Sequence, residues 1–149
     1  MAIQLAKLHE AYVATTVSTS NIELAKQLGA DEVIDYKTND FTSIIKDYDA
    51  VLVAAAEELG NSYKVLKKGG TLVSIVGNAD ENLAKEHGIT AITQMTQTST
   101  SQLKRLGELV DSGKIKPLID KIFTLNNAKE AFDYFEQKHP RGKVVIKIK

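Results

Sequence analysis

Residues 28–36 read Leu28-Gly29-Ala30-Asp31-Glu32-Val33-Ile34-Asp35-Tyr36, and they contain the end of one predicted helix and the strand that follows it. Ile22, Ala25 and Leu28 recur at the spacing of one helix face. Gly29 is the residue type that most often ends a helix. The second half of the stretch favours a short strand. The same helix and strand patterns alternate along the rest of the chain.

Strands are predicted at residues 12–17, 32–36, 50–54, 71–76, 89–94, 115–124 and 142–149. Helices are predicted at residues 2–8, 22–28, 41–46, 81–86, 99–112 and 127–135, with a further helix through Leu59, Tyr63 and Leu66 that ends at Gly69-Gly70. Residues 50–54 are apolar throughout, as in a strand covered on both faces. This alternation predicts an α/β fold in which helices flank a parallel sheet.

Bulk composition excludes several function classes. The 149 residues carry no net charge, so no bulk field attracts nucleic acid or a membrane surface, and the basic residues of the C-terminal tail are interpreted as a solvated face. No apolar run approaches the roughly 20 residues of a membrane span. The absence of cysteine excludes disulfides and thiolate metal sites and fits a cytoplasmic protein. His9, His87 and His139 lack metal-ligand spacing, so no metal site is predicted.

Four short sequence segments together resemble one protein family, namely Ala2–Lys7, Leu28–Tyr36, Leu66–Gly70 and Gly113–Pro117. They are similar to the cofactor domain and C-terminal tail of the zinc-independent medium-chain dehydrogenases/reductases, in the quinone-oxidoreductase-like branch. The resemblance covers essentially the whole chain. It implies one Rossmann-like domain over residues 1–149, with a nucleotide-binding core at 1–113 and a tail at 114–149 that contacts a substrate domain. The activity it implies is hydride transfer from NADPH to a quinone or an activated alkene.

The sequence departs from the family pattern in two places. It begins inside the helix that follows the glycine-rich turn, so the first Rossmann strand and both glycines that approach the pyrophosphate lack counterparts. Ala54–Glu58 stands where the family has a glycine pair. We therefore expect an N-terminally truncated or engineered NADP(H)-binding domain without catalysis of its own, binding the cofactor weakly or not at all. A non-enzymatic, self-associating or designed α/β scaffold is the alternative.

The resemblance also implies a set of cofactor-binding residues and no catalytic side chain. Ser18 and Ser20 would donate to the 2′-phosphate of NADPH, Tyr36 would flank it, and Gly77 and Asn78 would lie along the nicotinamide. No acidic residue follows the strand at 12–17, which favours NADPH over NADH. The competing interpretation is a helix cap and ordinary turns without a ligand, since Ser, Asn and Gly are common there.

The segment Ile89–Gln94 predicts self-association. It is rich in β-branched residues, uncharged and free of proline, so an edge strand of this composition is unprotected against pairing. In the family this strand pairs with its two-fold mate. The resemblance therefore implies a homodimer through this edge, with exchange of an element across the gap left by the missing strand as the alternative.

Overall fold

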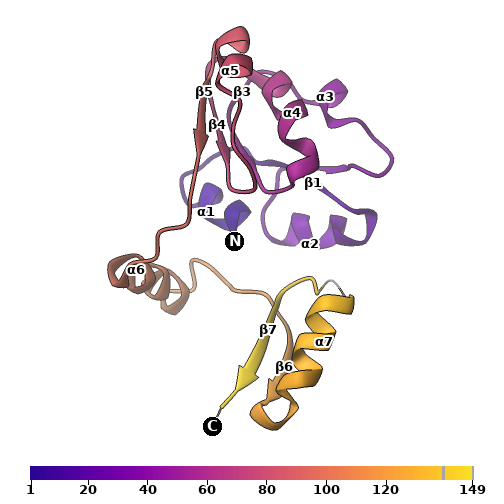
Figure 1. The fold of residues 1–149 in the computed structure, drawn as a ribbon, viewed down its shortest axis with the longest axis vertical. Coiled ribbons are helices and arrows are strands. Elements are labelled where there is room, and N and C mark those ends of the chain that lie inside the picture. Colours follow the sequence, from indigo (N-terminus) through magenta and orange to yellow (C-terminus); the bar gives the residue numbers. More distant parts are fainter. Residues whose placement is uncertain (139, 149) are drawn as a thin grey trace. The chain divides into compact units, whose positions relative to one another are not determined.

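The computed structural model describes residues 1–138 and 140–148 and confirms the α/β class (Figure 1). The helices are α1 (Ala2–Lys7), α2 (Ile22–Gln27), α3 (Phe41–Ile44), α4 (Leu59–Ser62), α5 (Glu81–His87), α6 (Thr100–Asp111) and α7 (Ala128–Lys138). The strands are β1 (Ala14–Val17), β2 (Glu32–Asp35), β3 (Tyr48–Val53), β4 (Leu66–Ser74), β5 (Thr90–Thr93), β6 (Ile119–Thr124) and β7 (Lys143–Lys147). Single 3₁₀ turns lie at Thr19–Asn21, Ala56–Glu58, Tyr63–Val65 and Leu125–Asn127.

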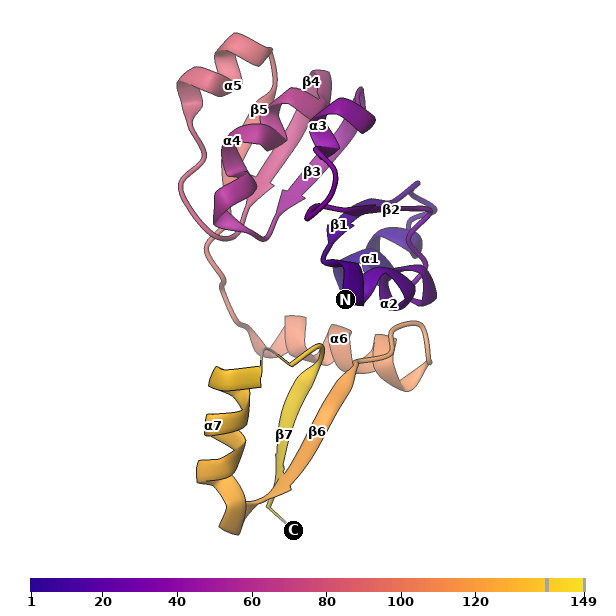
Figure 2. The same ribbon diagram turned by 90° about the vertical axis from the view of Figure 1, so that its right-hand side faces the viewer.

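The chain divides into two compact units, Asp35–Ser99 and the combination of Met1–Ile34 with Thr100–Lys149. In the first of these, β3, β4 and β5 form a parallel sheet in that order (Figure 2). Its core contains Val53, Tyr63, Leu72 and Ala84, and Leu72 is fully buried. The Tyr63 hydroxyl accepts a hydrogen bond of 2.6 Å from the backbone N–H of Asp80. This bond joins the core to the start of α5.

Two predictions about this unit are wrong. The helix expected to end at Gly69-Gly70 stops at Val65, and β4 already begins at Leu66. A Cβ on Gly70 would lie 2.9 Å from the Lys67 carbonyl oxygen and 3.1 Å from that of Asp49. Glycine at this position therefore permits β3 and β4 to pack closely where their pairing register shifts. The strand at 50–54 is not covered on both faces, because Leu52 is 49% exposed while the next residue, Val53, is buried.

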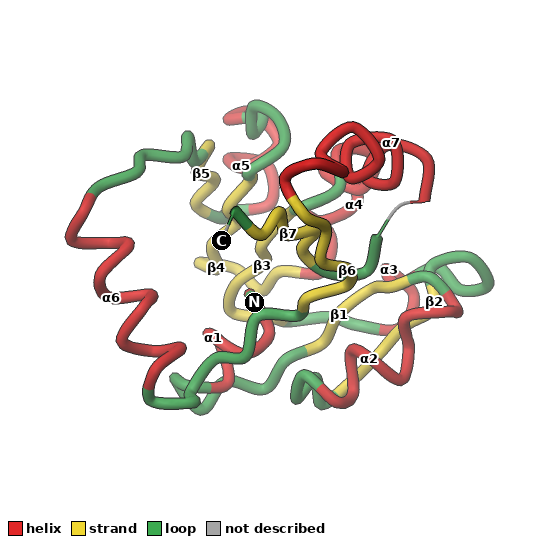
Figure 3. The backbone as a smooth tube through the Cα atoms, turned by 90° about the horizontal axis from the view of Figure 1, so that it is seen from below, coloured by secondary structure: helices red, strands yellow, loops and turns green. Residues whose placement is uncertain are grey.

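The other unit contains two separate strand pairs. β1 and β2 form one pair, with α2 beside them (Figure 3). β6 and β7 form a parallel pair, and α7 packs against it through Tyr134, whose ring centroid lies 5.8 Å from that of Phe123. In the doubly wound order 3-2-1-4-5-6, removal of strand 1 leaves a pair and a triplet. Those are the groups that β1–β2 and β3–β4–β5 form.

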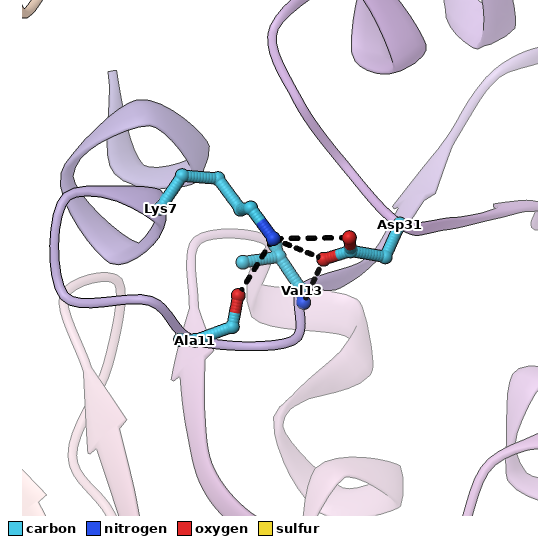
Figure 4. A network of polar contacts seen from close by, with 4 residues as sticks. All are labelled: Lys7, Ala11, Val13 and Asp31. Atoms are coloured by element: carbon cyan, nitrogen blue, oxygen red, sulfur yellow. Dashed lines mark hydrogen bonds and ion pairs between the residues drawn. The ribbon is translucent and has the colours of Figure 1, made fainter.

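Asp31 holds α1, β1 and β2 together (Figure 4). The Lys7 Nζ donates to Asp31 Oδ2 at 2.7 Å and to the Ala11 carbonyl at 2.9 Å. The backbone N–H of Val13 donates to the same carboxylate oxygen at 2.7 Å. The hydrogen bond from Lys7, followed by that from Val13, lowers the pKa of Asp31 below its ordinary value.

This network predicts a pH dependence of stability. Because the native pKa of Asp31 is lowered, its contribution is complete above the unfolded pKa and is lost as the pH falls through the native pKa. We expect Asp31→Asn to be less stable than the wild type at pH 7, and the difference to shrink below about pH 4. Urea unfolding at both pH values tests this, with Glu23→Gln in an exposed ion pair as the control. An Asp31→Asn deficit of equal size at the two pH values would contradict it.

Candidate functional site

The turn after β1 brings Ser18 and Ser20 together. Ser18 is extended (φ −73°, ψ 155°), and its carbonyl accepts from the Asn21 N–H at 2.8 Å, which closes the turn. The two serine hydroxyl oxygens lie 3.3 Å apart, and Asn21 Nδ2 donates to Ser18 Oγ at 3.2 Å. Neither Ser18 nor Asn21 makes a side-chain cap bond to the helical turn that follows it. Helix capping therefore does not account for these two side chains.

A cavity of about 320 Å³ opens beside this turn. The cavity lies within one unit, and both ends of the chain contribute to its walls. The N-terminal part contributes Ser20, Glu23 and Gln27, and the C-terminal part contributes Leu118, Asp120 and Arg141. A second cavity of about 290 Å³ shares Leu118 and Arg141 with it and reaches Gln4. Because they share these residues, we refer to the two cavities together as the groove.

Arg141 is the residue of this groove that the sequence interpretation missed. Its guanidinium makes no hydrogen bond or ion pair within residues 1–138 and 140–148. Both carboxylates of the groove are engaged elsewhere. Glu23 pairs with Lys26 at 3.0 Å. Asp120 accepts a hydrogen bond from the Tyr134 hydroxyl at 2.6 Å and another from the Arg141 backbone N–H at 3.3 Å. The hydrogen bond to Asp120 raises the pKa of Tyr134 above its ordinary value. The first cavity therefore places the Arg141 guanidinium beside a serine hydroxyl, and Lys143 adds a second cationic side chain at the adjoining cavity.

The remaining predicted site residues belong to the unit Asp35–Ser99. Tyr36 is 50% exposed in the turn after β2. Gly77 and Asn78 are exposed after β4, where Ser74 Oγ accepts from the Gly77 N–H at 3.3 Å. Among the described residues other than its two chain neighbours, the nearest atom to a Cβ on Gly77 would be Leu59 Cδ2 at 3.7 Å, so packing against these residues does not require glycine there.

The described part of the chain has neither a metal-ligand cluster nor a membrane-spanning helix. No three His, Cys, Asp or Glu side chains lie close enough together there to hold a metal ion. None of the helices in residues 1–138 and 140–148 is both long and apolar enough to cross a bilayer.

Comparison with known proteins reveals relatives along the whole chain. The sequence matches the family profile described as "Zinc-binding dehydrogenase" over residues 28–146. It is 34% identical, over 98% of its length, to the chloroplastic NADPH-dependent alkenal/one oxidoreductase of Arabidopsis thaliana. It is also 34% identical, over 97% of its length, to a chloroplastic quinone oxidoreductase of Triphysaria versicolor. The solved structure of the quinone oxidoreductase from Coxiella burnetii matches 99% of the chain with a TM-score of 0.86 and 33% identity.

The chain spans less than half the length of these relatives. It covers 36% of the Arabidopsis protein, 47% of the Triphysaria protein and 48% of the Coxiella structure. The fold of the Coxiella enzyme and the matched profile confirm both the Rossmann-like class and the resemblance stated above. The chain therefore belongs to the zinc-binding dehydrogenase family, and it corresponds to the cofactor-domain half of the quinone oxidoreductases within it.

Proposed function

We propose that this chain is the NADPH-binding part of a reductase that acts on a quinone or an activated alkene. The observation that supports this most is Arg141 beside Ser20 in one groove, with no uncommitted carboxylate. NADPH, when bound, supplies the hydride, and the protein supplies binding and orientation. A non-enzymatic scaffold is not favoured, because the relatives named above are oxidoreductases. Cytoplasmic localisation stays a prediction of the sequence.

The 2′-phosphate of NADPH is the group that fits the Ser18–Asn21 turn. The paired hydroxyls of Ser18 and Ser20 can donate to phosphate oxygens, and Arg141 adds the charge-assisted contact that the sequence lacked locally. NADH has a ribose hydroxyl at that position, and the turn carries no acid to accept from it. The resemblance to the family further implies that Tyr36 flanks the phosphate and that Gly77 and Asn78 border the nicotinamide in the whole enzyme.

Residues 114–149 form the part of the chain that we propose contacts a substrate domain. The β6–β7–α7 segment exposes large apolar side chains, with Ile122 at 58%, Phe132 at 65% and Phe135 at 59%. Exposed apolar surface of this kind marks an interaction site in proteins. The reaction on the substrate would then require both domains.

Titration of the 149-residue chain with NADPH and NADH tests the proposal. We expect an NADPH dissociation constant of about 0.1 mM or weaker, because the sequence contains no glycine-rich turn for the pyrophosphate. NADH should bind about tenfold more weakly than NADPH, since only NADPH offers a phosphate to Arg141. Arg141→Met should abolish this preference, whereas Lys129→Met on the exposed side of α7 should preserve it. Equal affinity for the two cofactors would reject the proposal, whereas micromolar NADPH binding would contradict only the expected weak affinity.

We also propose that β5 is a dimerisation strand. It lies at the edge of its sheet, where Ile92 is 42% and Met95 74% exposed. The Gln94 N–H donates to the Ser74 carbonyl at 2.8 Å, so by alternation the N–H groups of Ala91 and Thr93 point to the free edge. A second copy can pair with this edge around a two-fold axis. Exchange of an element between two copies of the chain is the alternative route.

Light scattering can separate these two routes. We expect the wild type to be a dimer and Ala91→Pro to be a monomer. Proline removes the N–H of residue 91, which faces the free edge and would bond the second copy, and it leaves the hydrogen bonds between β5 and β4 in place. Ala91→Ser, which retains the N–H, should remain dimeric. A monomeric wild type at high micromolar concentration would contradict self-association altogether. A dimeric Ala91→Pro would assign the interface to element exchange.

A further inference from the structure

Gln4 on α1 binds the backbone of a residue 112 positions later in the chain. Its Oε1 accepts from the Lys116 N–H at 2.8 Å, and its Nε2 donates to the Lys116 carbonyl at 3.1 Å. One side-chain amide thus satisfies both polar groups of one backbone residue. Lys116 begins a segment, Lys116–Asp120, that we call the strap. The strap follows Ile115, which is buried.

The strap in turn fixes the turn that contains Arg141. The Lys143 N–H donates to the Leu118 carbonyl at 2.7 Å, and the Arg141 N–H donates to Asp120 Oδ1 at 3.3 Å. Gly142, between them, lies so close that an added Cβ would be 2.5 Å from the Leu118 carbonyl oxygen. The backbone on both sides of the Arg141 side chain is therefore held by the strap.

The strap is also a wall of the groove. Leu118 and Asp120 line the cavity together with Ser20, and Gln4 lines the adjoining cavity that shares Leu118 and Arg141. A shift of the strap relative to α1 would move Arg141 relative to Ser20, which stands on the opposite wall.

We infer that Gln4 is a positioning residue: through the strap it sets the place of Arg141 opposite Ser20, and it thereby determines specificity for a 2′-phosphate. Gln4 itself does not touch the ligand. The inference rests on the proposed function, because it assumes that Arg141 binds the 2′-phosphate. It predicts that Gln4 and Arg141 act as one unit on that phosphate alone.

A double-mutant cycle tests this with adenosine 2′,5′-bisphosphate and adenosine 5′-monophosphate as probes, so that the pyrophosphate turn is not needed. Gln4→Met should weaken bisphosphate binding by about threefold to tenfold, the range for losing one or two hydrogen bonds, and leave monophosphate binding unchanged. In the Arg141→Met background, Gln4→Met should have no further effect. Gln97→Met, at an exposed glutamine of the other unit, should change neither affinity.

The outcomes separate the inference from the proposed function. If Arg141→Met leaves bisphosphate binding unchanged, the 2′-phosphate site itself is refuted. If Arg141→Met weakens it while Gln4→Met has no effect or an additive one, only the role of Gln4 is refuted. Equal loss for both probes would show a general structural effect and would also overturn the inference. Should Gln4→Met fail to fold, Gln4→Glu retains the acceptor for the Lys116 N–H and should weaken bisphosphate binding selectively; failure to do so refutes the inference.

Discussion

We expect Leu72→Ala to lower the free energy of unfolding by about 2–5 kcal/mol. Leu72 is fully buried in β4, where it is part of the core with Val53, Tyr63 and Ala84. β4 is the middle strand of its sheet, so neighbouring strands hold the backbone on both sides and limit its collapse onto the space left by the truncated side chain. The lost transfer free energy and the remaining cavity then both reduce stability.

Leu52→Ala is the matched control for this substitution. Leu52 lies on the adjacent strand β3 and is 49% exposed, so its truncation should change the free energy of unfolding by about 1 kcal/mol or less. Urea denaturation of both variants measures the difference. Equal losses for Leu72→Ala and Leu52→Ala would show that the three-stranded sheet does not have its core at Leu72.

Gly142→Ala should destabilise the other unit by about 1–3 kcal/mol. The new Cβ would be 2.5 Å from the Leu118 carbonyl oxygen and 2.9 Å from its carbonyl carbon. These are backbone atoms, which cannot rotate away as a side chain can. Relief requires the start of β7 to move away from Leu118, which breaks the 2.7 Å hydrogen bond between Lys143 and Leu118. Because Arg141 precedes this glycine, the preference for NADPH should decrease as well.

Gly107→Ala provides a control with the opposite sign. Gly107 lies within α6, and apart from the adjacent backbone of that helix no atom of the described residues comes within 4 Å of a Cβ placed there. Alanine is the better helix former by about 1 kcal/mol, so this variant should be more stable than the wild type. Thermal unfolding monitored by circular dichroism compares the two variants. A Gly142→Ala protein as stable as the wild type would contradict the close packing of β7 on the strap.

The local elements could be predicted because each carries its own pattern. The spacing of Ile22, Ala25 and Leu28 predicted α2, and Gly29 ends the helical segment with φ +97°. The pair Asn127 and Glu130 predicted the start of α7, where Asn127 Nδ2 donates to Glu130 Oε2 at 3.1 Å. The Gly69-Gly70 pair led to the wrong prediction of a helix end, because helix ends and irregular strands both favour glycine. Only the approach of Asp49 decides between them.

The candidate site could be predicted only in its local half. Ser18 and Ser20 are neighbours in sequence and follow a strand, so one stretch of sequence brought them forward. Arg141 lies in the same cavity as Ser20, and its backbone is held by the strap, which is bound in turn by Gln4. These long-range contacts have no local signal in the sequence. A basic residue in a charged terminal segment looks like solvated surface until its neighbours are known.

The most direct test of the 2′-phosphate site is a map of backbone amide NMR shifts. The protein is titrated with adenosine 2′,5′-bisphosphate, and the shifts caused by adenosine 5′-monophosphate are subtracted, which leaves the effect of the 2′-phosphate. The site described above predicts that the largest remaining shifts occur at Ser18, Ser20 and Arg141. Remaining shifts that are absent from these three amides, or that concentrate at Gly77 and Asn78, would contradict it.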